Sequence, residues 1–356
     1  MTIKKTGILA PVLLLGVCAM AEEATGPTVT FTGYLDEDMA ATYNKDTKEL
    51  EYQANHEADF VANVAFSEKT TISLGITSYT SKSVPSGGTP VIDEEGNQTR
   101  WPSMAFDGIW GSYATDMGLT LLAGDFCVTG GTFSYYGYKR TLFYGSVFKE
   151  NYFRGLGFDF KGISLYAGSS DTANNTTAAY FAYLFENGMI SLKPFAFGTS
   201  NFDGVWNVKA GLDAQITLGD NVITATYGII KDDDMDPSHT IKAEASLVFG
   251  SFTLAATGFY AIIPDDDASV VDVPDESFFY VEPGYTINDV ISTGMPLELH
   301  TREKGVEDTD FSVYPTLYVN PTGGSQIVVW AGPTFFVDDS DADPVFSFGT
   351  ELIASF

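Results

Sequence analysis

The chain has 356 residues and a formal net charge of −29, because 47 Asp and Glu residues face only 18 Lys and Arg. This charge argues against nucleic acids or anionic membrane surfaces as partners. Aromatic residues make up 14% of the chain, glycine occurs 35 times, and only 18% of residues are charged, which together favour many β-strands joined by tight turns.

Residues 1–21 have the pattern of a secretory signal peptide. A basic start, "MTIKK", precedes the short apolar run "GILAPVLLLGV", and "AMA" before Glu22 is a small-residue cleavage site. Cys18 in "LLGVC" leaves a lipoprotein open, although Val17 is larger than the residue usual before a lipidated cysteine. We expect residues 22–356 to form one domain without an intramolecular disulfide, because Cys127 is its single cysteine.

Segments with a period of two residues then follow one another along the chain. "ISLGITSY" at 72–79, "VWNVKAGLDAQITL" at 205–218, "HTIKAEASLVF" at 239–249 and "FSVYPTLYVN" at 311–320 each place apolar side chains on one face and mostly polar ones on the other. Alternation of this kind predicts strands. After residue 21 no apolar run is long enough for a membrane-spanning helix.

The connections between these strands alternate between short turns and long polar loops. A soluble β-sandwich would also have strands with one apolar face, but this asymmetry of connections is typical of outer-membrane barrels, whose periplasmic turns are short and whose outer loops are long. A sheet in hydrocarbon must also close on itself to satisfy its backbone groups. We therefore predict an all-β fold, a transmembrane antiparallel β-barrel of about 18 strands, with 16 as the alternative count.

The last stretch, "VFSFGTELIASF", alternates to its final residue. We predict that it is the strand that closes the barrel against the first strand, and that it carries a C-terminal signal read by the barrel assembly machinery. The residues assigned to this signal are Phe346, Phe348, Leu352 and Phe356.

The chain resembles Gram-negative porins, and loosely the β-barrel porin-2 group, in "FTGYLDEDMAATYN", "LLAGDF", "YFRGLGFDFKGISLYAG", "EPGYTINDVISTGMPLELH" and "YPTLYVNPTGG". The resemblance implies a passive channel for small hydrophilic solutes, embedded in outer-membrane lipid, and leaves a trimer open. The competing interpretation is a barrel with a filled lumen that serves as a surface adhesin or binding protein. No catalytic residue, metal site or cofactor is expected, since the motifs of such sites are missing from the sequence.

Two sets of residues are candidates for the pore. The loop from Thr129 to Asn151 is the third long connection, and we expect it to fold into the lumen, narrow it and offer tyrosines to sugars; lumen filling without selectivity and packing over the rim remain open. Its candidate constriction residues are Tyr135, Tyr136, Tyr138, Lys139 and Arg140. Strand parity also directs charged side chains inward, where they would set a field across the lumen or stand as scattered, solvated charges. These wall candidates are Asp36, Asp38, Lys209, Asp213, Lys242, Glu244, Glu298, His300 and Arg302.

Overall fold

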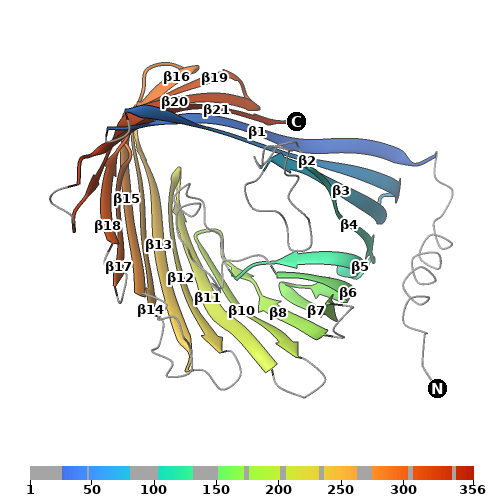
Figure 1. The fold of residues 1–356 in the computed structure, drawn as a ribbon. Coiled ribbons are helices and arrows are strands. Elements are labelled where there is room, and N and C mark those ends of the chain that lie inside the picture. Colours follow the sequence, from blue (N-terminus) through green and yellow to red (C-terminus); the bar gives the residue numbers. More distant parts are fainter. Residues whose placement is uncertain are drawn as a thin grey trace, which may run out of the picture.

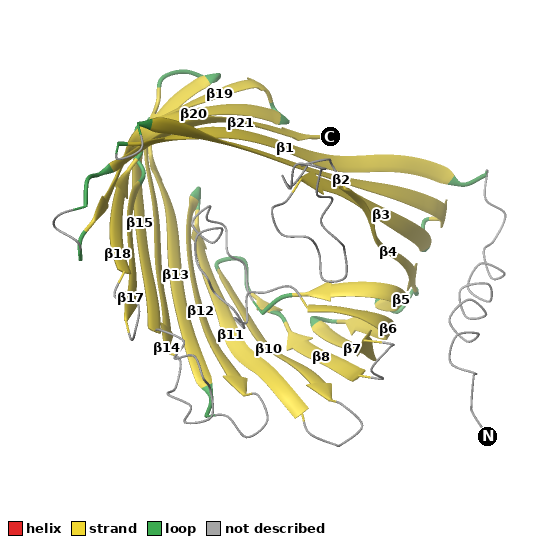
Figure 2. Cartoon of the chain, in the orientation of Figure 1, coloured by secondary structure: helices red, strands yellow, loops and turns green. Residues whose placement is uncertain are grey.

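The computed structural model describes residues 26–45, 48–80, 103–130, 151–171, 176–200, 206–231, 236–262, 275–303, 308–338 and 342–356. Strands account for nearly all of these residues (Figure 2). No helix within these ranges is long and apolar enough to cross a bilayer. The predicted signal peptide lies outside them.

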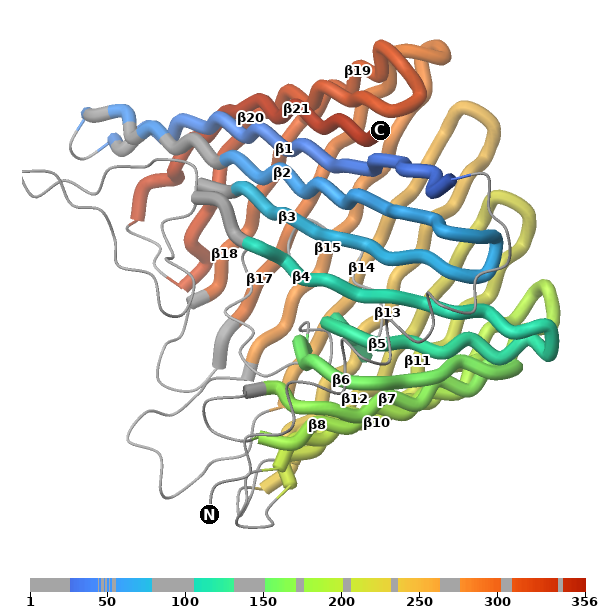
Figure 3. Tube along the Cα trace, turned by 90° about the vertical axis from the view of Figure 1, so that its right-hand side faces the viewer, coloured from blue at the N-terminus to red at the C-terminus, as the bar shows by residue number. Residues whose placement is uncertain are grey.

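One antiparallel sheet of 21 segments makes up the fold (Figures 1 and 3). The first half consists of β1 (Thr28–Asn44), β2 (Glu49–Ser67), β3 (Thr70–Thr80), β4 (Ser103–Ala114), β5 (Leu119–Val128), β6 (Asn151–Phe160), β7 (Ile163–Asp171), β8 (Thr176–Tyr183), β9 (Phe185–Glu186) and β10 (Ile190–Ser200). The second half consists of β11 (Trp206–Leu218), β12 (Asn221–Lys231), β13 (Ser238–Phe249), β14 (Phe252–Ile262), β15 (Asp275–Thr286), β16 (Ile291–Gly294), β17 (Leu297–Glu303), β18 (Asp308–Val313), β19 (Thr316–Thr322), β20 (Ser325–Phe336) and β21 (Val345–Ser355).

Three of the barrel's strands are each broken into two segments. β10 pairs with both β8 and β9, β15 with both β16 and β17, and β20 with both β18 and β19. The 21 segments therefore form eighteen strands, which confirms the predicted number. Pro296 and Pro315 lie at two of the breaks, as expected of a residue that has no N–H to donate to a ladder.

The barrel closes between its first and last strands. β1 pairs antiparallel with β21 from Tyr34, opposite Ser355, to Tyr43, opposite Phe346, and the two strands lie side by side in Figure 1. The Phe356 amide donates to the Gly33 carbonyl at 3.1 Å, and the Gly33 amide donates to the Phe356 carbonyl at 2.9 Å. The Phe356 ring lies where a Cβ of residue 33 would be, so only glycine fits there without a shift of the ring.

Short turns join many neighbouring strands, as between β6 and β7. There Lys161 and Gly162 have φ angles of 48° and 83°. A two-residue hairpin loop favours a turn with positive φ at both central residues, because the twist of that turn matches the twist of the two flanking strands.

Side chains sort by parity across the barrel wall. In β11 the apolar residues of the alternating stretch face outward, with Trp206, Leu212 and Leu218 exposed, while Lys209 and Asp213 point the other way. The outward face of β21 carries exposed Phe346, Phe348 and Leu352. An apolar exterior around a polar interior is the arrangement that hydrocarbon requires of a spanning sheet.

Candidate functional site: the inner wall of the barrel

An acidic strip follows the closure of the barrel on its inner face. On β1, Asp36 lies directly opposite Glu57 of β2, and Asp38 lies opposite Glu351 of β21. Tyr34 donates from its hydroxyl to Asp36 Oδ2 at 3.1 Å. We call this set of inward carboxylates the seam strip. Its members are Asp36, Asp38, Glu57, Asp59 and Glu351.

Charged side chains of the wall formed by β11, β12 and β13 have hydrogen-bond partners on the wall. Lys242, which is 0% exposed, donates from Nζ to Glu244 Oε2 at 2.9 Å. The Thr226 hydroxyl donates to Asp213 Oδ1 on the neighbouring strand. Lys209 donates from Nζ to Asn151 Oδ1 at 2.8 Å, which links β11 to the start of β6.

A histidine between two carboxylates occupies the next section of wall. His300 is 3% exposed, and its Nε2 lies 2.5 Å from Glu276 Oε1 while its Nδ1 lies 3.6 Å from Asp310 Oδ2. Glu298, two residues before it on β17, is also buried. The backbone of Arg302 lies opposite Glu276. Glu298 and His300 thus share the inner face of β17, but the carboxylates nearest His300 come from the neighbouring strands.

Aromatic side chains cover the inner wall formed by β5 to β10. Rings stack between Phe126 and Tyr166, with centroids 5.1 Å apart, and between Tyr166 and Tyr180 at 5.4 Å. Phe153 and Phe197 approach with centroids 5.9 Å apart. We call this set the aromatic cluster. Its members are Phe126, Phe153, Tyr166, Tyr180, Phe195 and Phe197.

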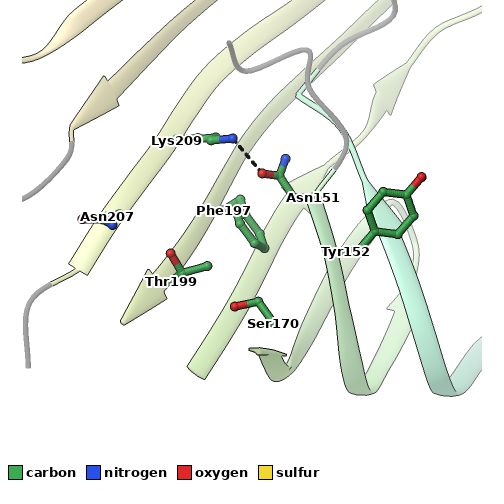
Figure 4. A pocket seen from close by; sticks show the side chains of 7 residues that line it. All are labelled: Asn151, Tyr152, Ser170, Phe197, Thr199, Asn207 and Lys209. Carbon is green, nitrogen blue, oxygen red and sulfur yellow. Dashed lines mark hydrogen bonds between the residues drawn. The ribbon is translucent and has the colours of Figure 1, made fainter. Parts of the chain in front are cut away.

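A pocket of about 290 Å³ lies beside this cluster (Figure 4). Phe197 forms one side, and the Lys209 to Asn151 hydrogen bond spans another. The remaining lining residues are Tyr152, Ser170, Thr199 and Asn207. Hydroxyl and amide groups beside an aromatic ring suit a polar solute better than an apolar one.

A second set of polar residues faces the lipid. Glu37 and His56 lie opposite one another on β1 and β2, with Glu37 Oε1 hydrogen-bonded to His56 Nδ1. His56 Nε2 lies 3.3 Å from the Ser78 hydroxyl. Apolar outward residues flank them along both strands, namely Phe31, Met39, Tyr52 and Phe60. We call Glu37, His56 and Ser78 the outer polar cluster.

The predicted constriction residues lie outside the described residues, as does the part of their loop from 131 to 150. The wall candidates are all on described strands, and two of them, Lys242 and Glu244, form an ion pair. Sequence reasoning missed Glu57, Asp59 and Glu351, because parity gives the face of a residue but not the strand beside it. No group of three or more His, Cys, Asp or Glu side chains in the described part could hold a metal ion.

Neither a protein-family model nor a curated protein matches the chain. Solved structures match it over most of its length. OccAB2 of Acinetobacter baumannii has a TM-score of 0.55 at 10% identity, and OpdK of Pseudomonas aeruginosa, solved with vanillate, has 0.55 at 12%; each match covers 92% of this chain and 98% of the other. A BenF-like porin from Pseudomonas fluorescens Pf-5 has a TM-score of 0.56 at 11% identity, with the same coverage. The chain therefore has the fold of porin barrels of the bacterial outer membrane.

Proposed function

We propose that the protein is a passive outer-membrane channel for small hydrophilic solutes. The observation that carries this proposal is the charged and polar inner face of a closed eighteen-strand barrel whose outer face is apolar. Eight strands leave only enough interior for side chains, whereas barrels of about 16 to 18 strands enclose water. Channel activity of the similar solved porins supports the same conclusion at the level of the fold.

Liposome swelling tests this proposal. Vesicles that contain the refolded mature protein should swell in isotonic solutions of small neutral solutes, and the rate should fall as solute size rises. Vesicles with heat-denatured protein are the control. Equal, negligible swelling with folded and denatured protein would contradict a channel.

We further propose sugars as a solute class, on the basis of the tyrosines in the loop from Thr129 to Asn151. Aromatic faces bind the apolar faces of sugar rings, and Lys139 and Arg140 would pair with carboxylates of the wall. Oligosaccharides added at increasing concentration should then block single-channel current in a saturable way. Block of the same size by a polyethylene glycol of equal radius would show size exclusion alone.

A barrel with a filled lumen that acts as a surface adhesin is the second candidate. The aromatic cluster favours it, because Phe153, Phe195 and Phe197 are each less than 10% exposed although they point into the barrel. Rings packed in this way occupy lumen volume. This candidate predicts a correctly folded barrel that does not conduct, and acidic outer loops that bind a partner.

The last strand and the apolar exterior of the barrel each indicate a further partner, the barrel assembly machinery and outer-membrane lipid. We propose that the assembly machinery recognises β21 with Phe356, because the last strand must be held until it pairs with β1. Outer-membrane lipid surrounds the apolar exterior. No enzymatic activity is proposed.

We also propose that copies of the chain associate through the outer polar cluster. Charged side chains that face lipid are costly near the bilayer midplane, and Glu37 and His56 lie among apolar neighbours on both strands. The outer polar cluster holds both a hydrogen-bond acceptor, Glu37, and a hydrogen-bond donor, His56. The same cluster on a second copy of the chain therefore offers it matching partners. Asp125 and Arg154 form another outward ion pair in the described part of the chain, with Arg154 Nε 2.5 Å from Asp125 Oδ1.

Sedimentation in detergent tests this association. Glu37→Leu with His56→Leu should convert an oligomer, such as the trimer that the sequence leaves open, into a monomer. Asp125→Leu with Arg154→Leu is the matched control and should leave the mass unchanged. A monomeric wild-type protein would refute the association.

A further inference from the structure

Strand register places the inner side chains of β7, β8, β10 and β11 in rows across the wall. One row is large, and its members are Tyr166, Tyr180, Phe197 and Lys209. The row two residues away on each strand is smaller, and its members are Gly168, Ala178, Thr199 and Asn207. Residues two apart on a strand share a face. This step in side-chain size accounts for the pocket of about 290 Å³ beside the Phe197 ring.

The pocket lies at the end of the barrel away from the short turns. Thr199 is the last but one residue of β10, and Asn207 is the second residue of β11. The turn that joins β11 to β12, at residues 219–220, is at the opposite end of that strand. A solute that enters from the side of the long loops therefore reaches this pocket before the rings of Tyr166 and Tyr180.

The neutral polar groups of the pocket can both donate and accept hydrogen bonds. They are the hydroxyls of Ser170 and Thr199 and the amide of Asn207. A solute hydroxyl also does both, whereas a carboxylate only accepts and an ammonium only donates. Either ion would leave part of this lining unmatched, which costs free energy. A solute with several hydroxyls matches the lining best.

The charge beside the pocket argues against a cationic solute. Lys209 borders the pocket, and its Nζ donates to Asn151 Oδ1 at 2.8 Å (Figure 4). No Asp or Glu is among the lining residues that the structure describes. The lysine repels a cation and leaves a neutral solute unaffected. An anion that carries hydroxyls, such as a sugar acid, is the competing ligand.

Phe197 gives the pocket one flat, apolar side. The face of an aromatic ring carries a negative partial charge, and the C–H groups of a sugar ring carry a positive one, so the two rings pack face to face. Phe197 is 7% exposed, and its ring centroid lies 5.9 Å from that of Phe153. Packing therefore holds the ring in place before a solute arrives, and its ordering adds little to the cost of binding.

We propose that this pocket is a binding subsite for one neutral monosaccharide, or a polyol of similar size, at the long-loop end of the channel. Pockets for drug-sized ligands measure about 300–1,000 Å³, so a pocket of about 290 Å³ suits a small ligand. The sugar ring lies on Phe197, and its hydroxyls bond to Ser170, Thr199 and Asn207. The inference rests on the proposed channel function and deepens it, because it assigns the sugar site to described residues of the wall instead of to the loop tyrosines.

Direct binding to the refolded mature protein tests the subsite without relying on conductance. Methyl α-D-glucopyranoside is titrated and followed by saturation-transfer NMR in lauryldimethylamine oxide, a detergent without a sugar headgroup. Binding to the wild-type protein should be saturable. Sodium glucuronate, titrated in the same way, provides the comparison with an anion of similar size.

Two variants remove the ring and one hydroxyl separately. Phe197→Leu keeps an apolar side chain without an aromatic face and should weaken binding about threefold to tenfold. Thr199→Val keeps the shape without the hydroxyl and should weaken it about twofold to tenfold. The matched controls are Phe259→Leu and Thr257→Val, which make the same changes on the inner face of β14, outside the pocket. Both should bind like the wild-type protein.

The heat-dependent gel shift shows which variants are folded, and Thr199→Val carries the test if Phe197→Leu does not fold. Unchanged binding in the folded pocket variants overturns the inference, as does an equal loss in the two controls. Glucuronate bound about tenfold more tightly than the glycoside also overturns it, because the pocket would then be an anion site beside Lys209.

Liposome swelling with the same preparations separates the subsite from the channel function. Vesicles that swell with wild-type protein that binds no glycoside overturn the subsite and leave the channel function intact. Saturable binding that depends on Phe197, without swelling, overturns the channel function and leaves the pocket as a sugar site in a closed barrel.

Discussion

Glu244→Ala should strongly destabilise the barrel, because it leaves a buried ammonium without its carboxylate. Lys242 is 0% exposed, and its Nζ lies 2.9 Å from Glu244 Oε2. Breaking a buried ion pair by removing one partner costs about 3–5 kcal/mol, whereas replacing both partners by apolar residues of similar volume is often neutral or stabilising. The variant Lys242→Met with Glu244→Leu should therefore regain most of the stability that Glu244→Ala loses.

The exposed pair between Lys69 and Asp116 provides the control. Their charged atoms are 2.7 Å apart, but the side chains are 45% and 85% exposed, and exposed pairs contribute about 0–1 kcal/mol. Urea unfolding of the barrel in phospholipid vesicles measures the loss of stability in Glu244→Ala and in Asp116→Ala. Unfolding is followed by tryptophan emission and by the heat-dependent gel shift. Equal losses for Glu244→Ala and Asp116→Ala would refute the reasoning, because burial would then not set the cost.

Three other changes have defined outcomes. Deletion of Phe356 should slow assembly, since it removes the two hydrogen bonds with Gly33; surface display at the wild-type rate would contradict the proposed terminal signal. Gly155→Val should prevent β6 from pairing normally with β7, because a Cβ there would collide with the backbone of the neighbouring strand, and an unchanged gel shift and melting temperature would argue against this close approach. Lys139→Ala with Arg140→Ala should shift the reversal potential further toward cations, and an unchanged potential would remove that loop from the pore.

Much of the fold is predictable because the period of two residues is local. The alternation from Trp206 to Leu218 gives both the strand and its outward face. Short turns such as Lys161 and Gly162 mark strand ends within a few residues. Counting such segments gives the eighteen strands. The breaks at Pro296 and Pro315 are harder to predict, since a proline also occurs at strand edges and in turns.

The site is less predictable because it depends on which strands are neighbours. Asp36 and Asp38 can be assigned to the inner face from β1 alone, but their apposition to Glu351 exists only after the two ends of the chain meet. The carboxylate of Glu276 beside His300 likewise comes from another strand. Glu37 and His56 break the outward apolar pattern, and that break was the available signal for the outer polar cluster.

Single-channel recording from the refolded mature protein in a planar bilayer tests the central claim most directly. A water-filled barrel predicts steady ohmic steps whose size rises with salt concentration. A preparation that shows the heat-dependent gel shift of a closed barrel, yet gives no steps at any salt concentration, would contradict the claim and leave the filled-lumen candidate in its place.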